Sequence, residues 1–247
     1  MKVTPIKTHI ITPGENLLEI LDRYITTLSE KSIVAVTSKI VAVCERSIVK
    51  QEEADKDELI EKESQYFLPR KENPYNVSFA IKNNILAVSA GIDESNGNGY
   101  FILWPKDPQE SANTIREFLC RKFNLKYVGV ILTDSKTTSM RWGVTAIAIG
   151  YSGFAPLKSY INQPDLFHRP FAFEQMSIID NVACSAALVM GEGNEQMPLA
   201  VVSDVPMVEF VNHNPTTEEL RSIQITLEED LYGSFLKNAP WKKGQQK

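Results

Sequence analysis

Apolar and polar positions alternate along the chain in patterns typical of both helices and strands. Residues 16–28 carry apolar side chains at positions i, i+3, i+4 and i+7, which predicts an amphipathic helix. Residues 32–36 form a short apolar run, as expected for a strand that is covered on both faces. Residues 78–90 predict a hairpin, because Asn83 and Asn84 tolerate the positive φ of a tight turn.

Capping residues and further apolar runs predict the remaining elements. Asp107 followed by Pro108 is a strong helix start, and Gly191 is suited to the position just after a helix. Residues 156–173 are irregular and rich in proline, which predicts a cover or a domain connection. The other predicted strands span 1–11, 101–104, 127–135, 144–151 and 198–203, and the other predicted helices span 40–45, 51–65, 107–123, 174–190 and a segment from 215.

Composition narrows the class of protein. The 247 residues allow one large domain or two small ones, and the net charge of −5 offers no electrostatic footprint for nucleic acid. Only the tail from Lys237 to Lys247 is locally basic, and we expect it to be a frayed, solvated terminus. Three widely spaced cysteines predict reduced thiols, and no apolar run is long enough to cross a membrane. We therefore expect a soluble cytoplasmic protein.

Two apolar strands end in clusters of oxygen-bearing side chains. The first is followed by Asp93 and Glu94, and the second ends in Thr133, Asp134 and Ser135. Strand ends of this kind present ligands to metals and phosphates, which suggests that the two aspartates meet around a divalent cation. The alternative is that each aspartate caps a turn, as aspartates at strand ends commonly do.

A third strand end carries Ser38 and Lys39 and runs directly into a predicted helix. Free N–H groups and the helix dipole favour an anion at such a place. Alternatively, Ser38 caps the helix, and the two interpretations are compatible.

Several reaction classes have no support in the sequence. It contains no phosphate loop of the G-x-x-x-x-G-K-[ST] type, no G-x-G-x-x-G at a helix start, no H-E-x-x-H and no nucleophile elbow. His9, His168 and His213 are far apart in the chain. What remains is a set of carboxylates suited to bind magnesium or manganese. Lys39 and Arg141 would supply positive charge to bind phosphate groups. This combination indicates phosphoryl transfer.

The residues that carry this chemistry occur in strings that resemble one family. Thr37-Ser-Lys39, Ala90-Gly-Ile-Asp-Glu-Ser-Asn96, Thr133-Asp-Ser135, Arg141-Trp-Gly143, Ala148-Ile-Gly150 and Leu188-Val-Met-Gly191 are similar to motifs of the F420-0:γ-glutamyl ligase family. The similarity extends in order over roughly residues 10–205. It implies an α+β fold of mixed or antiparallel sheets with packed helices in two lobes. It also implies a homodimeric ligase that uses GTP or ATP and two divalent cations to form a γ-glutamyl amide bond.

The resemblance assigns roles to individual residues. Asp93 and Asp134 match the ligands of one metal, and Ser135 and Glu192 match those of a second. In the mechanism that this implies, Lys39 and Arg141 would stabilise the transferred phosphoryl group through their positive charge. Nucleotide contacts fall on Thr8, His9, Ile10, Ile11, Ser38, Lys39, Asn96, Met190, Gly191, Glu192, Gly193, Asn194, Glu195, Gln196 and Met197. The catalytic domain would span residues 1–214, followed by a helix and basic tail over 215–247.

Departures from the family pattern bear on the acceptor. Val43 replaces a common lysine, and residues 134–141 differ from the family loop. Together with Tyr151-Ser-Gly-Phe154 and Asp165-Leu-Phe167, they resemble a bacterial branch associated with folate metabolism. We therefore expect L-glutamate to be added to a pterin or folate acceptor through an acyl phosphate, with F420-0 as the alternative acceptor. A nucleotide- and metal-binding module without ligase activity and a metal-dependent phosphohydrolase are further alternatives.

Overall fold

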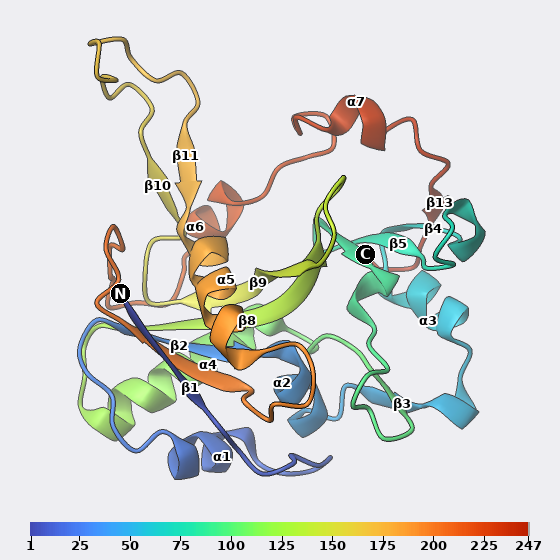
Figure 1. Cartoon of the computed structure of the whole chain (residues 1–247), viewed down its shortest axis with the longest axis horizontal. Coiled ribbons are helices and arrows are strands. Elements are labelled where there is room, and N and C mark those ends of the chain that lie inside the picture. Colours follow the sequence, from blue (N-terminus) through green and yellow to red (C-terminus); the bar gives the residue numbers. More distant parts are fainter. Residues whose placement is uncertain (247) are drawn as a thin grey trace.

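A five-stranded mixed sheet forms the main lobe of the computed structural model, which describes residues 1–246 (Figure 1). The strand order is β1-β12-β2-β8-β9, and β2 and β8 are parallel whereas the other neighbours are antiparallel. The strands are β1 (Lys2–Ile6), β2 (Ser32–Thr37), β8 (Val128–Thr137), β9 (Val144–Ser152) and β12 (Leu199–Ser203).

Helices cover both faces of this sheet, which explains why residues 33–36 of β2 are all apolar. Ile33 and Ala35 pack with α5, whereas Val34 and Val36 pack with the helices on the opposite face. Alternate residues of a strand point to opposite faces, so a strand covered twice has no polar positions. The main-lobe helices are α1 (Leu17–Tyr24), α2 (Ser38–Cys44), α4 (Pro108–Phe123) and α5 (Ile178–Met190).

Residues 48–102 form a small lobe with a core of its own, which includes Ile60, Ala80 and Ile92. This confirms the expected two-lobed α+β arrangement. The small lobe contains β3 (Ile48–Lys50), η1 (Gln51–Glu53), α3 (Lys56–Glu63), β4 (Tyr66–Leu68), η2 (Arg70–Glu72), β5 (Phe79–Lys82), β6 (Ile85–Val88), η3 (Ser89–Gly91) and β7 (Tyr100–Ile102).

Several predicted boundaries were wrong. The helix predicted over 51–65 begins only at Lys56, because the Asp55 side chain accepts hydrogen bonds from two N–H groups of its first turn. The helix predicted over 174–190 begins at Ile178 with Ser177 as its cap, since residues 175–177 form a strand.

The basic tail is not frayed, so that expectation was wrong. The chain continues from α6 (Thr217–Ser222) through α7 (Gly233–Leu236) to β13 (Lys242–Lys243), which pairs antiparallel with β4. The Gly244 and Gln246 amides donate to the Gln65 and Ser64 carbonyls at 2.8 and 3.0 Å. The C-terminal segment therefore runs from the main lobe to the small lobe, where it covers an open sheet edge (Figure 1).

The predicted domain boundary at residue 214 stays a prediction.

Residues 156–173, expected to be a cover or connection, belong to a hairpin arm that projects from the main lobe (Figure 1). Its strands are β10 (Leu157–Ser159) and β11 (Gln175–Ser177), and bridges such as Ile161↔Phe171 continue it outward. Among residues 1–246, the structure contains no helix long and apolar enough to span a bilayer.

Candidate active site

Asp134 lies on β8 just after a bulge between Leu132 and Thr133. The Trp104 indole N–H donates to its Oδ2 at 2.5 Å, and the Ser38 hydroxyl lies 3.5 Å from its Oδ1. Burial raises the pKa of the Asp134 carboxyl, and the Asp93 charge adds to this shift, while the Trp104 hydrogen bond opposes it. Asp134 is thus a partly buried carboxylate that forms no ion pair within residues 1–246.

Asp93 lies on the small lobe, where its backbone bridges to Ile102. The Lys39 ammonium is 2.7 Å from Asp93 Oδ2, and the Ser95 amide donates to Oδ1 at 2.7 Å. Burial alone would raise the pKa of Asp93, but the hydrogen bond and charge of Lys39, with those from Ser95, outweigh it and lower the pKa. Oδ1 of Asp93 therefore closes a turn, as the alternative interpretation expected, and Oδ2 pairs with the Lys39 ammonium.

The first turn of α2 brings the two aspartates to one place. Ser38 reaches Asp134, and the adjacent Lys39 reaches Asp93. Thr37, not Ser38, is the N-cap residue, and its side chain makes no capping bond. The interpretation of Ser38 as a helix cap was therefore wrong.

A second pair of predicted metal ligands also meets. The Ser135 hydroxyl donates to Glu192 Oε2 at 2.6 Å, although 57 positions separate them. Glu192 follows Gly191, whose φ of +80° turns the chain out of α5. Gly191 has a ψ of 174°, and this combination of φ and ψ is essentially restricted to glycine, so the turn favours glycine.

The predicted nucleotide-contacting segments lie side by side. The side-chain amide of Asn96 donates to the Gly193 carbonyl at 2.9 Å, and the backbone N–H of Thr8 donates to the Gln196 carbonyl at 3.0 Å. The loop at residues 190–197 therefore joins the N-terminal segment to the loop that carries Asp93.

Some predicted contacts have side chains engaged elsewhere. The His9 ring lies 2.6 Å from the Glu15 carboxylate and 2.8 Å from the Tyr24 hydroxyl. Met190, the last residue of α5, is buried in the core between that helix and the sheet, and Ile11 packs against the core on the opposite face. Ile10 is exposed. Contacts from His9 and Met190 to a ligand would have to come from the backbone.

The structure does not bring Arg141 to the carboxylates. It lies exposed in the turn between β8 and β9, beyond the last strand pair at Thr137 and Val144. Within the described chain its side chain makes no hydrogen bond or ion pair, and its amide donates to Thr138. Its role stays a prediction.

Comparison with known proteins now identifies the family. Residues 5–204 match the model of the F420-0:gamma-glutamyl ligase family.

The chain belongs to the F420-0:γ-glutamyl ligase family.

Its relatives include proteins named coenzyme F420:L-glutamate ligase. Those of Methanococcus maripaludis strains C7 and S2 are 30% and 31% identical, over 84% and 86% of this chain and 89% and 91% of theirs. The relative in Methanocaldococcus jannaschii is 28% identical over 82% of this chain and 87% of its own. Membership confirms the expected resemblance and the expectation of an amide-bond-forming ligase.

The donor set in this ligase fits hard cations. No three His, Cys, Asp or Glu side chains within residues 1–246 form a preassembled metal cluster. The predicted ligands are instead arranged as two pairs, Asp93 with Asp134 and Ser135 with Glu192. Magnesium sites commonly combine one or two carboxylates with substrate phosphates and water. A cation would also neutralise the partly buried Asp134 carboxylate, which has no cationic partner in hydrogen-bond contact among these residues.

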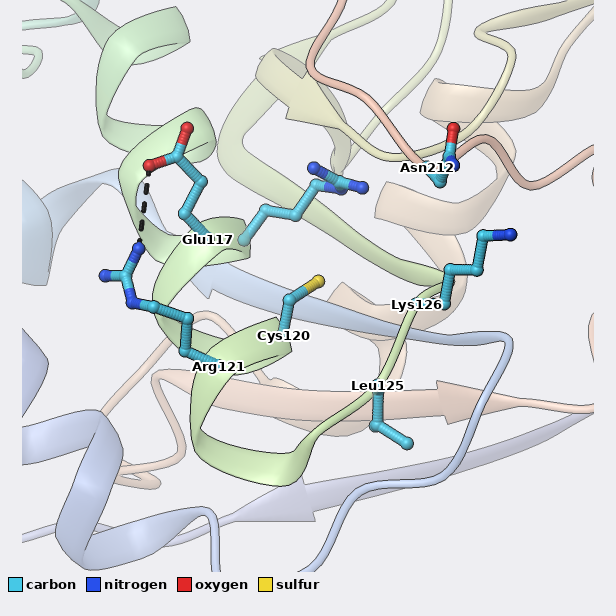
Figure 2. A pocket seen from close by; sticks show the side chains of 7 residues that line it. Glu117, Cys120, Arg121, Leu125, Lys126 and Asn212 are labelled. Atoms are coloured by element: carbon cyan, nitrogen blue, oxygen red, sulfur yellow. Dashed lines mark ion pairs between the residues drawn. The ribbon is translucent and has the colours of Figure 1, made fainter.

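A groove on α4 is separate from this site. It has a volume of about 310 Å³, and Figure 2 shows Glu117 and Arg121 paired on the helix with Asn212 across from them. The buried Arg116 guanidinium donates to the Val128 carbonyl and the Asn214 side chain, which ties α4 to the C-terminal segment. The groove contains none of the predicted site residues.

Sequence reasoning missed Trp104. In the sequence it is one of four consecutive residues, 101–104, predicted as an apolar strand, and that pattern does not separate it from a core residue. Only the structure shows that its indole contacts Asp134. Glu94, counted among the acidic candidates, instead pairs with Lys56 of α3 at 2.5 Å.

Proposed function

We propose that this ligase joins L-glutamate to F420-0 at the expense of a nucleoside triphosphate, with divalent cations as cofactors. The observation that carries the proposal is the network in which Lys39 pairs with Asp93 while Ser38, its neighbour, contacts Asp134. Carboxylates from two lobes that meet beside a lysine suit a nucleotide triphosphate with its metal.

The acceptor follows from the relatives. Proteins similar to this chain over most of its length are named for F420, and this favours F420-0 as the acceptor. The folate-type acceptor, expected from Val43 and residues 134–141, receives no support from these relatives, and F420-0 replaces it in the proposal.

Asp93 with Asp134, and Ser135 with Glu192, would hold the two cations. A bound cation supplies neutralisation of the triphosphate and of the charge that develops during transfer. Asn96, Thr8 and the loop at residues 190–197 would contact the nucleotide, which we propose to be GTP.

The reaction has two balanced steps. A carboxylate oxygen of the acceptor attacks the γ-phosphorus, the bond to the nucleoside diphosphate breaks, and an acyl phosphate forms. The amine of glutamate then attacks the acyl carbon, phosphate leaves, and the nitrogen loses a proton. Lys39 would stabilise the transferred phosphoryl group, and its ion pair with Asp93, a proposed metal ligand, supports this role.

We also propose that the protein is a homodimer in which the hairpin arm contacts a second copy. Leu166, Phe167 and Phe173 on the arm are each more than 80% exposed. Apolar side chains gathered on a projecting element indicate an interaction surface. Light scattering after size exclusion should give a dimer for the wild type and a monomer for Leu166→Ser with Phe167→Ser. A monomeric wild type at micromolar concentration would contradict the proposal.

The deciding experiment measures glutamate incorporation with F420-0, tetrahydrofolate and dihydropteroate in parallel, each with GTP or ATP and with magnesium or manganese. We expect a glutamylated product with F420-0 and GTP that depends on the divalent cation. Product with a folate acceptor alone would overturn the acceptor. Phosphate release without glutamate would indicate a phosphohydrolase, and nucleotide binding without any product would indicate a binding module.

A further inference from the structure

Trp104 connects the two lobes at the candidate active site. It follows β7 of the small lobe, is only 3% exposed, and donates its indole N–H to Oδ2 of Asp134 on the main-lobe sheet. The 2.5 Å distance marks a short hydrogen bond, and bonds to an ionised acceptor are the stronger kind. An indole nitrogen can donate a hydrogen bond but cannot accept one. The bond therefore favours the orientation of the Asp134 carboxylate in which Oδ2 accepts from Trp104.

The loop that carries Asp93 is built around the same indole. Gly91 has a φ of +72°, and a Cβ there would lie 2.1 Å from Trp104 Nε1 and 2.4 Å from Cε2. Only glycine allows the backbone to approach the ring this closely. The preceding residue, Ala90, is buried and also left-handed, with a φ of 53°. The Asp93 loop and the Asp134 carboxylate thus share one rigid support.

The ring itself is held by a buried ion pair. The Lys82 ammonium lies 5.3 Å from the ring centroid, within cation–π range. Lys82 is 4% exposed and pairs with Glu63 of α3 at 2.7 Å. A ring contacted by glycine, lysine and aspartate has little freedom to rotate, so its N–H keeps a constant direction.

We propose that Trp104 is a positioning residue for the divalent-cation site, acting through Asp134. The inference rests on the proposed metal role of Asp134. By occupying Oδ2, the indole leaves Oδ1, which has only a long 3.5 Å contact with Ser38, as the freer donor for a cation. Outer partners that orient metal ligands typically contribute about 10–100-fold to metal affinity.

The test compares Mn²⁺ binding by calorimetry, in the presence of GTP, for the wild type and Trp104→Phe. Phenylalanine retains an aromatic ring but removes the N–H, and we expect Mn²⁺ affinity to fall about 10–100-fold. The matched control is Trp241→Phe, because the Trp241 indole N–H also donates, to the Leu236 carbonyl at 2.6 Å in the C-terminal segment, and its loss should leave affinity unchanged. Thermal melting of each variant establishes that the fold is retained.

A second measurement leaves Trp104 in place. In a Trp142→Phe and Trp241→Phe double variant, Trp104 is the sole tryptophan, and paramagnetic Mn²⁺ should quench its emission with the midpoint found by calorimetry. Magnesium should not quench it. If Trp104→Phe fails to fold, absence of quenching in this variant still overturns the inference, because an indole bonded to a metal ligand lies within quenching range of the ion.

The outcomes separate the inference from the function on which it rests. If the wild type binds Mn²⁺ and Trp104→Phe binds it within twofold as tightly, Trp104 has no positioning role and the metal site stands. Binding without quenching of Trp104 overturns the inference in the same way. If the wild type binds no Mn²⁺, the proposed metal site and the inference both fall.

Discussion

The two lobes offer the candidate active site one aspartate each, in opposite environments. Asp134 of the main lobe lies partly buried on a ten-residue strand, accepts from Trp104, and has no ion pair within residues 1–246. Asp93 of the small lobe is on a loop and pairs with Lys39, with its side chain 44% exposed. Burial raises the pKa of Asp134, whereas Asp93 keeps a lowered pKa because Lys39 and Ser95 outweigh its burial. A bound cation would therefore supply the positive charge that Asp134 lacks among residues 1–246, whereas Asp93 already has a cationic partner in Lys39.

The replacement Asp134→Asn tests this contrast most strongly. We expect the rate of glutamate incorporation to fall about 10³-fold. A bound metal stabilises the transition state by several kcal/mol, and each ~1.4 kcal/mol corresponds to a tenfold change in rate. The melting temperature should stay equal or rise, since removal of a partly buried charge that has no ion pair removes its desolvation penalty. Asp204→Asn is the matched control, because Asp204 follows β12 at the end of the sheet away from the site and has a φ of 51° that asparagine tolerates. Near-normal turnover of Asp134→Asn would remove the metal assignment.

Asp93→Asn should abolish activity to a similar extent but differ in stability. Loss of its ion pair with the partly exposed Lys39 should cost less than about 1 kcal/mol, given solvent screening. Urea denaturation of both aspartate variants, side by side, would show a small decrease for Asp93→Asn only. Equal stability changes in the two variants would contradict the contrast between the lobes.

Gly91→Ala probes the junction between the lobes. A methyl group 2.1 Å from the indole nitrogen should destabilise the protein by about 1–3 kcal/mol, with the melting temperature lower by about 2–4 °C for each kcal/mol. Gly99→Ala is the control, since Gly99 also has a positive φ, of +87°, but no atom within 4 Å of an added Cβ. The difference between the two variants isolates contact with Trp104, and equal effects would mean that the ring moves freely.

Removal of residues 242–247 should have the smallest effect and should be confined to the small lobe. Without β13, amide hydrogen exchange should accelerate over residues 61–68, which pair with the tail, while the main-lobe strand β8 keeps its protection. Unchanged exchange over residues 61–68 would show that the tail contributes nothing to the β4 edge.

Local pattern alone determined much of this protein. The apolar run at residues 32–36 predicted a strand covered on both faces, because each side chain of such a strand must avoid water. Asn83 and Asn84 predicted a hairpin turn, and both adopt positive φ. The family motifs predicted candidate site residues, and several of them contact one another although they are far apart in the sequence.

Tertiary structure alone decided which distant groups meet. Neither periodicity nor spacing could show that Trp104 donates to Asp134, that β13 pairs with β4, or that Arg141 lies away from the carboxylates. Helix and strand patterns depend on neighbours within one or two turns of the chain. Contacts between loops depend instead on how the two lobes pack. That packing is determined jointly by residues that are far apart in the sequence.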